Sequence, residues 1–493
     1  MTSAVGGLLL DLATPDVGWW PLTYVSVALG LIALIGRSIG GAILVGAMYG
    51  GVFFFTHLVW VGTFLGPIPW LALAGLQTIL FAVTAVPITL AFRWSAQFPR
   101  GSVLVLWAVP ALVGAIWVAR EGVLGAWPYG GFPWARLGVT QVDAPIASVA
   151  SWTGVSGLSF VIAFLTAAGV QAARTPAGAR LRRSVPPAVA LSVMMLVPAF
   201  PTAPAGTLAV GWVQGNGPAG YFDDRDPGAM LNSQLQATDP LIGQRIDLLV
   251  WPEGSVDTDP THIPETAQQL NSTVSIVGAP LLANAITTRG NETFNTSLLW
   301  TGNAADLQFY DKINPVPFGE YVPDRPFYEA IAPQLVNLIQ RDYSRGTVPP
   351  VVRVNDISIG LAICFDVIYD TVIWDSVRAG ADLLIFQTNN ADFRGTDENL
   401  QQLAFAKMRA IETGRSVVNV STVGTSQVIA SDGRILAAAA VDTVAADITD
   451  VPLRAGTTAG VQIGPWVIPT LSALSLAGLL WLSATRTRAH KEK

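Results

Sequence analysis

Three side chains that together could carry out acyl chemistry stand directly after short apolar runs in the second half of the chain. Glu253 follows Leu-Leu-Val-Trp-Pro, Lys312 follows Phe-Tyr-Asp, and Cys364 follows Leu-Ala-Ile. Such runs are typical of buried strands, and residues at strand ends are held rigidly beside a cleft. A carboxylate that accepts a proton, an ammonium that stabilises an oxyanion and a nucleophilic thiol are sufficient for acyl transfer. We therefore predict that Glu253, Lys312 and Cys364 are catalytic.

Each of these residues also has a purely structural interpretation. Cys364 suits a small core position, Glu253 suits a helix cap, and Lys312 suits a surface charge. Against this, Cys364 is the only cysteine of the chain, and an unpaired thiol outside the cytoplasm is an oxidation liability. The stretch 206–461 uses Arg 13 times and Lys only twice, so an amine of adjustable pKa is favoured at Lys312.

The sequence predicts no metal, no cofactor and no nucleic-acid partner. One cysteine excludes an intramolecular disulfide, and His57, His262 and His490 are too far apart to show a metal-chelating spacing. The stretch 206–461 contains 29 acidic residues and 15 basic ones. This acidic excess argues against nucleic acid or an anionic lipid surface as the main partner of that stretch.

The elements that position these residues belong to a chain with two physical regimes. It is 51% hydrophobic and 13% charged, whereas roughly a quarter of the residues in soluble proteins are charged. Only four of its 34 acidic residues precede residue 206. We expect a helical membrane domain at 1–205, a water-exposed catalytic domain at 206–460, and a last membrane helix with a basic tail at 461–493.

Seven apolar stretches are near the ~20 residues that a helix needs to cross a bilayer. Helices are expected because lipid leaves the backbone polar groups to be satisfied within each segment. The first dozen residues are too short to span, so we predict a re-entrant piece or a truncated helix there. The seven stretches are 20–35, 40–65, 67–92, 103–119, 154–173, 185–200 and 461–483.

Basic residues lie in every second loop, which predicts the orientation of the chain. The opposite loops carry only Arg120 and Arg136. We therefore expect 206–460 outside the cytoplasm and the C-terminus inside it. The basic loop residues are Arg37; Arg93 and Arg100; Arg174, Arg180, Arg182 and Arg183; and Arg486, Arg488, Lys491 and Lys493.

Within 206–460 the pattern changes to short β-rich runs separated by helix-like stretches, the clearest of which is 398–412. Continuous apolar strands indicate sheets that are covered by helices, so an α/β sandwich is expected. The predicted strands are 207–213, 246–251, 274–277, 297–300, 357–363, 383–386, 417–420 and 427–430.

The order Trp-Pro-Glu253, Asp-Lys312 and Cys364 resembles the nitrilase superfamily, whose triad is Glu, Lys and Cys. The wider match is to its membrane branch, the bacterial apolipoprotein N-acyltransferases, and it covers nearly the whole chain. The fold implied is a polytopic helical membrane domain plus an extracytoplasmic nitrilase-type αββα sandwich. The further similar stretches are Gly-Phe-Pro-Trp at 131–134, Val-Gln-Gly-Asn at 213–216, and the segments 317–323, 388–390 and 408–415.

The resemblance implies a monomeric enzyme of the bacterial cell membrane that works by a two-step exchange. The thiolate takes an acyl chain from a phospholipid and passes it to the amine of a lipoprotein's N-terminal diacylglyceryl cysteine. Glu253 is then the base, Lys312 the oxyanion partner and Cys364 the nucleophile. Glu320 matches a second glutamate that supports the site.

The residues around the triad depart from the family pattern in three places. Phe365-Asp366 stand where Tyr-Glu is usual, Asn390 replaces Asp, and Asp392 replaces Trp. Supporting or substrate-binding roles are implied for Phe365, Asp366 and Asn389. The departures leave the triad intact and bear on donor and acceptor preference.

Two other functions fit the same triad. A membrane-tethered amidase or nitrile hydrolase would use water as the acceptor, and a silent scaffold would keep only the fold. The loop 314–335, rich in Pro and aromatic residues, fits either a lid that dips into the bilayer or a segment packed on its own domain.

Overall fold

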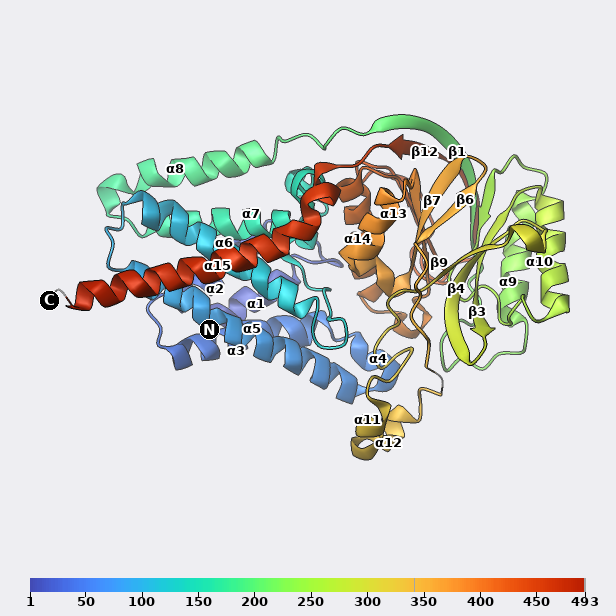
Figure 1. The fold of residues 1–493 in the computed structure, drawn as a ribbon, viewed down its shortest axis with the longest axis horizontal. Helices are drawn as coiled ribbons and strands as arrows, with labels where there is room; N and C mark the ends of the chain where they lie inside the picture. Colours follow the sequence, from blue (N-terminus) through green and yellow to red (C-terminus); the bar gives the residue numbers. More distant parts are fainter. Residues whose placement is uncertain (341, 492–493) are drawn as a thin grey trace. The chain divides into compact units, whose positions relative to one another are not determined.

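The computed structural model describes residues 1–340 and 342–491. It divides into two compact units (Figure 1). Met1–Phe200 and the chain from Ala459 onward form the helix unit, and Pro201–Thr458 forms the sandwich unit. These boundaries lie a few residues from those expected at 205/206 and 460/461.

The helix unit consists of long apolar helices joined by short connections. Gly154 has non-helical backbone angles and marks a kink within α7. The tail residue Lys493 lies outside the described residues. The helices are α1 (Thr2–Asp11), α2 (Leu22–Leu34), α3 (Ile39–His57), α4 (Val61–Leu65), α5 (Pro67–Ser95), the π-helix η1 (Leu104–Ala108), α6 (Val109–Leu124), the 3-10 turns η2 (Leu137–Gln141) and η3 (Pro145–Val149), α7 (Ala150–Ala173), α8 (Ala177–Met194) and α15 (Ala459–Lys491).

Five helical segments of the described chain are long and apolar enough to cross a membrane, fewer than the seven expected. They are Ile39–His57, Pro67–Ser95, Leu104–Leu124, Pro145–Ala173 and Ala459–Thr487. Two expected spans are absent from this set for different reasons. The helix α2 has only 13 residues, and α8 contains three arginines in its first turns, which lower its mean hydropathy.

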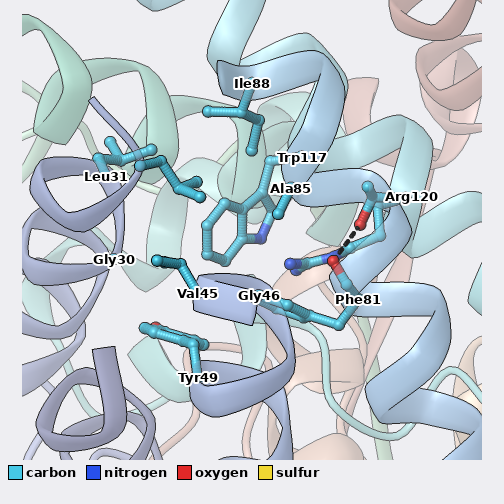
Figure 2. Close-up of a pocket in the computed structure, with 12 residues that line it drawn as sticks. Gly30, Leu31, Val45, Gly46, Tyr49, Phe81, Ala85, Ile88, Trp117 and Arg120 are labelled. Atoms are coloured by element: carbon cyan, nitrogen blue, oxygen red, sulfur yellow. Dashed lines mark hydrogen bonds between the residues drawn. The ribbon is translucent and has the colours of Figure 1, made fainter. Parts of the chain in front are cut away.

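A buried arginine lies inside the helix unit (Figure 2). Arg120 belongs to α6, so its prediction as a loop residue is wrong. Its guanidinium carbon lies 4.1 Å from the ring centres of both Phe81 and Trp117. Contacts of this kind stabilise a cation that has left water. The connections opposite the basic ones therefore carry only Arg136. Arg93, Arg180, Arg182, Arg183 and Arg486 were also predicted outside the helices, but they lie in the last turn of α5, the first turns of α8 and in α15.

The sandwich unit contains two six-stranded sheets. In each sheet the central strands pair in parallel and the outer ones antiparallel. The first sheet has the order β12 (Ala445–Ala455), β1 (Ala203–Gln214), β2 (Leu248–Val250), β3 (Leu281–Arg289), β4 (Glu292–Trp300), β5 (Gln308–Asp311). The second has the order β11 (Ile435–Ala438), β10 (Gln427–Ile429), β9 (Val417–Ser421), β8 (Leu383–Thr388), β7 (Ile357–Ile363), β6 (Val351–Val354).

Helices cover the outer faces of both sheets, and an apolar core lies between the sheets. Val210 and Val250 from the first sheet and Ile363 and Ile385 from the second are fully buried in one cluster. This shared core confirms the predicted sandwich. The helices and 3-10 turns are α9 (Ala229–Thr238), η4 (Asp239–Leu241) and α10 (Pro264–Val277) on the first sheet, η5 (Ala304–Asp306), α11 (Arg325–Ile331) and α12 (Pro333–Val336) in the connections, and η6 (Cys364–Ile368), α13 (Asp370–Arg378), η7 (Ala391–Phe393) and α14 (Glu398–Thr413) on the second.

The predicted strand at 274–277 is wrong, because these residues form the last turn of α10. Its β-branched residues suggested a strand, but Pro264 begins a helix that continues to Val277 and ends at Gly278, whose φ of 76° closes it. The predicted helix at 398–412 corresponds to α14.

Candidate active site

The three predicted catalytic residues come from strand ends of the two facing sheets. Glu253 lies three residues after β2, and Lys312 directly follows β5 in the same sheet. Cys364 directly follows β7 in the other sheet. The main chain fixes Glu253 and Lys312 further: Thr422 Oγ1 donates to the carbonyl oxygen of Glu253 at 2.8 Å, and the N–H of Lys312 donates to the carbonyl of Asn295 at 2.9 Å.

Cys364 occupies a sharp turn between β7 and η6. Its φ is 48°, in the left-handed region that residues with a side chain seldom adopt. Such strain costs about 1–2 kcal/mol and persists where surrounding contacts enforce it. The turn aims the thiol toward the carboxylates of the opposite sheet, and Glu253 is a hydrogen-bond partner of the thiol.

Buried Arg409 of α14 enforces the conformation of this turn. Its Nε donates to the carbonyl of Val367 and its Nη2 to the carbonyl of Ile368, both at 2.9 Å. Its Nη1 contacts carboxylate oxygens of Asp370 and Glu412, both at 2.7 Å. The planar guanidinium therefore connects four groups around the turn that presents the thiol.

Lys312 lies between two carboxylates. Its Nζ is 2.9 Å from Glu320 and 3.6 Å from Glu253. The Lys312 side chain is 1% exposed, so the ammonium is held almost entirely by protein groups. Glu320 is fixed in turn by the N–H of Val316, which donates to its Oε2 at 2.7 Å. The structure thus brings together Glu253, Lys312, Glu320 and Cys364.

An asparagine that the sequence analysis did not select links the two glutamates. Asn295 of β4 donates from Nδ2 to Glu253 Oε1 at 2.8 Å and to Glu320 Oε1 at 3.2 Å. Its Oδ1 accepts from Asn284 Nδ2 at 2.9 Å, and Asn284 Oδ1 accepts from the N–H of Gly254 at 2.8 Å. This chain of amides orients Glu253. The sequence carries no signal for this chain of amides, because neither Asn284 nor Asn295 lies in a predicted strand.

Burial and charge set the protonation of the three groups. Burial raises the pKa of Glu253, while nearby Lys312 opposes this shift. Burial, followed by the charge of Glu253, raises the pKa of Cys364 well above its usual value. Burial works to lower the pKa of Lys312, but Glu320 and Glu253 overcome it and raise that pKa. The resting site therefore holds a neutral thiol, a permanent ammonium and a carboxylate of increased basicity.

A second polar network approaches the thiol from α14. Gln402 Nε2 lies 3.4 Å from Cys364 Sγ. Asn390 Nδ2 donates to Gln402 Oε1 at 2.9 Å and to Glu398 Oε2 at 2.7 Å. Burial raises the pKa of Glu398 to about 8, although the bond from Asn390 acts in the opposite direction. Sequence reasoning missed Gln402 and Glu398. Their signal was their spacing of four residues on one face of a predicted helix.

The remaining predicted supporting residues have distinct placements. Buried Asp366 accepts from Tyr310 Oη at 2.6 Å and from Asn314 Nδ2 at 2.9 Å, and its charge acts on Lys312. Phe365 packs edge-on against Tyr369, with ring centres 5.4 Å apart. Asn389 Nδ2 donates to the carbonyl of Ala219 at 2.9 Å, which ties the loop after β8 to another loop and does not bring Asn389 to the thiol.

The loop predicted as a lid contains α11 and α12. Phe318 packs edge-on against Tyr328 with ring centres 4.9 Å apart, so part of the loop packs on itself. Phe327 and Ile331 are more than half exposed. Closure of this loop over the site remains a prediction.

Comparison with known proteins gives the two units separate matches. The family model for the apolipoprotein N-acyltransferase N-terminal domain matches residues 6–168, and the model for carbon-nitrogen hydrolases matches residues 210–457, half of the chain.

Curated relatives extend over both units. The apolipoprotein N-acyltransferase of Vibrio vulnificus is 28% identical over 99% of this chain and 98% of its own. The protein of the same name from Mycolicibacterium smegmatis is 29% identical over 96% of this chain and 83% of its own. The apolipoprotein N-acyltransferase of Photobacterium profundum is 28% identical over 87% of this chain and 84% of its own. The chain therefore belongs to the carbon-nitrogen hydrolase family, in the membrane branch formed by the apolipoprotein N-acyltransferases.

Proposed function

We propose that this protein transfers a fatty acyl chain from a membrane phospholipid, through a thioester on Cys364, to the N-terminal amine of the diacylglyceryl cysteine of a lipoprotein. One observation carries the proposal: a buried carboxylate, ammonium and thiol of the hydrolase type belong to the same chain as a helix unit matched by the N-terminal domain of apolipoprotein N-acyltransferases. A hydrolase of small soluble amides has no use for such a unit.

The first half-reaction forms the thioester. Glu253 takes the proton of the Cys364 thiol as the sulfur attacks the ester carbonyl of the phospholipid. Lys312 stays charged and stabilises the oxyanion of the tetrahedral intermediate. The intermediate collapses, the carbon–oxygen bond of the ester breaks, and the leaving lysophospholipid alkoxide receives the proton from Glu253.

The second half-reaction transfers the acyl chain to nitrogen. The amine of the lipoprotein attacks the thioester, Lys312 again faces the oxyanion, and Glu253 receives a proton from the attacking nitrogen. The carbon–sulfur bond then breaks and the thiolate regains that proton. Donor and acceptor are both anchored in lipid, so one site that serves them in turn gives ping-pong kinetics.

The fixed positions of Glu253 and Lys312 suit this division of labour. Burial raises the pKa values of both Glu253 and Cys364, which keeps the carboxylate basic enough to accept the thiol proton when the nucleophile attacks. Asn295 and Glu320 act as positioning residues, because Asn295 contacts Glu253 and Glu320 contacts Lys312.

The test is intact-mass measurement of the full chain after incubation with phospholipid vesicles and no acceptor amine. We expect one acyl adduct that hydroxylamine removes and that Cys364→Ala lacks. Lys312→Ala should form the adduct at least ~100-fold more slowly, because an oxyanion donor contributes ~2.7–4 kcal/mol. The matched control is Lys407→Ala, which removes the only other lysine of residues 201–458 and should acylate normally.

Two outcomes would contradict the proposal. If Cys364→Ala acquires the same adduct, the thiol is not the nucleophile. If the adduct on the wild-type protein hydrolyses as fast as it forms, the protein is a lipid hydrolase, and the membrane-tethered hydrolase is the better description.

A further inference from the structure

A cavity of about 350 Å³ lies within the helix unit. None of the residues that line it belongs to the candidate active site. Cavities of this size are in the range that binds small ligands. Its wall combines an aromatic ring, aliphatic side chains and two guanidinium groups. The lining includes Leu106, Trp107, Ala168, Arg182, Arg183 and Pro187.

Two irregular pieces of backbone form this cavity. Leu106 and Trp107 belong to η1, a π-helix, and π-helical turns are rare and frequent at functional sites. On the facing helix α8, Pro186 and Pro187 follow one another. Two prolines remove two backbone N–H groups and prevent regular close packing. The cavity is thus a consequence of the sequence at two separate places.

The charge of the cavity is uncompensated. None of Arg100, Arg174, Arg180, Arg182 and Arg183 forms an ion pair within 1–340 and 342–491, and the sequence from 144 to 222 has no acidic residue. Burial and then the charge of Arg100 lower the pKa of Arg174.

Arg183 is directed at the loop that precedes η1. A Cβ added to Gly101 would stand 2.1 Å from Arg183 Nη2, so the guanidinium lies directly over the glycine backbone. Two guanidiniums, Arg182 and Arg183, therefore converge on one cavity at the edge of a membrane unit. Such planar groups bind phosphate through paired hydrogen bonds.

A second face of α8, about a third of a turn from the cavity lining and next to Arg182, carries exposed apolar side chains. Leu181, Val185 and Val189 are 80%, 49% and 53% exposed. Their spacing of four residues places them on one face of the helix. A ligand with a phosphate in the cavity and acyl chains along this face would satisfy both surfaces.

We infer that this cavity is a binding site for an anionic phospholipid, whose phosphate is held by Arg182 and Arg183 and whose acyl chains lie against Leu181, Val185 and Val189. The charge selects an anionic headgroup, because basic pockets between membrane helices attract such lipids. Glu253, Lys312 and Cys364 belong to the sandwich unit and this cavity belongs to the helix unit, so we assign a resident lipid to it. The inference does not depend on the proposed acyl transfer.

The experiment is native mass spectrometry of the full chain, stripped of lipid and incubated with vesicles of equal parts phosphatidylglycerol and phosphatidylcholine. We expect one retained phosphatidylglycerol on the wild-type protein. The double variant Arg182→Gln/Arg183→Gln should retain at least tenfold less. The control is Arg180→Gln, which removes one arginine charge from the same helix outside the lining and should retain the lipid as the wild type does.

Two further experiments distinguish a specific lipid site from misfolding of the variant and from a plain anion site. Arg182→Lys/Arg183→Lys keeps the charge and should recover binding, which excludes misfolding as the cause of the loss. In the other experiment inorganic phosphate replaces the vesicles. Equal retention by the glutamine pair, equal loss in Arg180→Gln, or no preference for phosphatidylglycerol would overturn the inference. Thermal stabilisation by inorganic phosphate that equals the stabilisation by lipid would also overturn it, because the cavity would then be a plain anion site.

Discussion

Two carboxyl groups act on the Cys364 thiol from different directions. Glu253 is its hydrogen-bond partner, and Glu398 reaches it through Asn390 and Gln402. Burial and the charge of Glu253 disfavour a thiolate, so the thiol stays protonated until a substrate is in place. A neutral resting thiol is protected from oxidation, because oxidation depends on thiolate character.

Glu398 should make stability depend on pH. Burial raises its pKa from 4.5 to about 8. Between about pH 5 and 8 the unfolded chain loses a proton that the folded protein keeps, so this group lowers stability as pH rises, by up to ~1.4 kcal/mol per pH unit. Glu398→Gln removes the effect. Its thermal midpoint should exceed that of the wild type by an increasing margin from pH 5 to pH 8.

The control for this measurement is Glu265→Gln, which changes an exposed glutamate in the first turn of α10. It should leave the pH dependence of the midpoint unchanged. Parallel curves for the wild type and Glu398→Gln would show that Glu398 does not hold its proton in the folded protein.

The sequence predicts the candidate residues that follow strands. It does not predict the residues that contact them from distant parts of the chain. Glu253, Lys312 and Cys364 could be found because each follows a short apolar run. Asn295 lies inside β4 but outside the strand predicted at 297–300. Gln402 lies within α14, where the helical pattern predicts only burial. Their partners among the site residues are 25 or more residues away, and local spacing carries no information on such pairs.

At the scale of elements, helix α14 organises the thiol side of the site. Glu398, Gln402 and Arg409 lie on one face of it, and all three are buried. Gln402 contacts the sulfur itself, and Arg409 holds the carbonyls of the turn that follows it. The sequence predicted α14 from its periodicity but misassigned the end of α10, because the β-branched residues there resemble a short strand.

Arg409→Lys should loosen the turn while keeping the positive charge. A lysine ammonium cannot reproduce the paired N–H donors of the planar guanidinium, so the hydrogen bonds to the carbonyls of Val367 and Ile368 are lost. The free energy of unfolding should fall by roughly 3–6 kcal/mol, since each of the two lost hydrogen bonds involves a charged group and contributes roughly 1.5–3 kcal/mol. Cys364 is the only cysteine, so a thiol reagent reports on this turn alone and should label the variant faster than the wild type.

The comparison variant is Arg434→Lys, at an exposed arginine whose partner Asp432 is also exposed. It should label and unfold like the wild type, because exposed ion pairs contribute little. Slower or unchanged labelling in Arg409→Lys would mean that Arg409 supports only the helix.

At the scale of the whole molecule, the two units differ in charge. The helix unit has the composition of a membrane domain, and the sandwich unit has that of a domain in water. The sandwich unit carries most of the acidic residues, whereas the helix unit carries an excess of arginine in alternate loops. The composition alone predicted both units, since lipid and water select different residues. The number of spans could not be predicted as well: α2 is shorter than its apolar stretch, and α8 combines an apolar face with arginines.

The charge asymmetry gives a last prediction, on orientation. Arg120 lies inside α6, so the connections on one side of the helix unit hold Arg136 as their single described basic residue. The connections and helix ends on the other side hold Arg37, Arg93 in the last turn of α5, Arg100, Arg174, and Arg180, Arg182 and Arg183 in the first turns of α8. Basic loops stay in the cytoplasm. Residues 201–458 should therefore face outward, on the side where the proposed transfer to an exported lipoprotein would take place. A periplasmic phosphatase reporter inserted at the exposed residue Pro227 should be active, and one fused after the C-terminus should be silent. A cytoplasmic reporter should give the reverse result at the two positions. If both positions report the same side, α15 does not cross the membrane, and the access of Cys364 to both lipids needs another explanation.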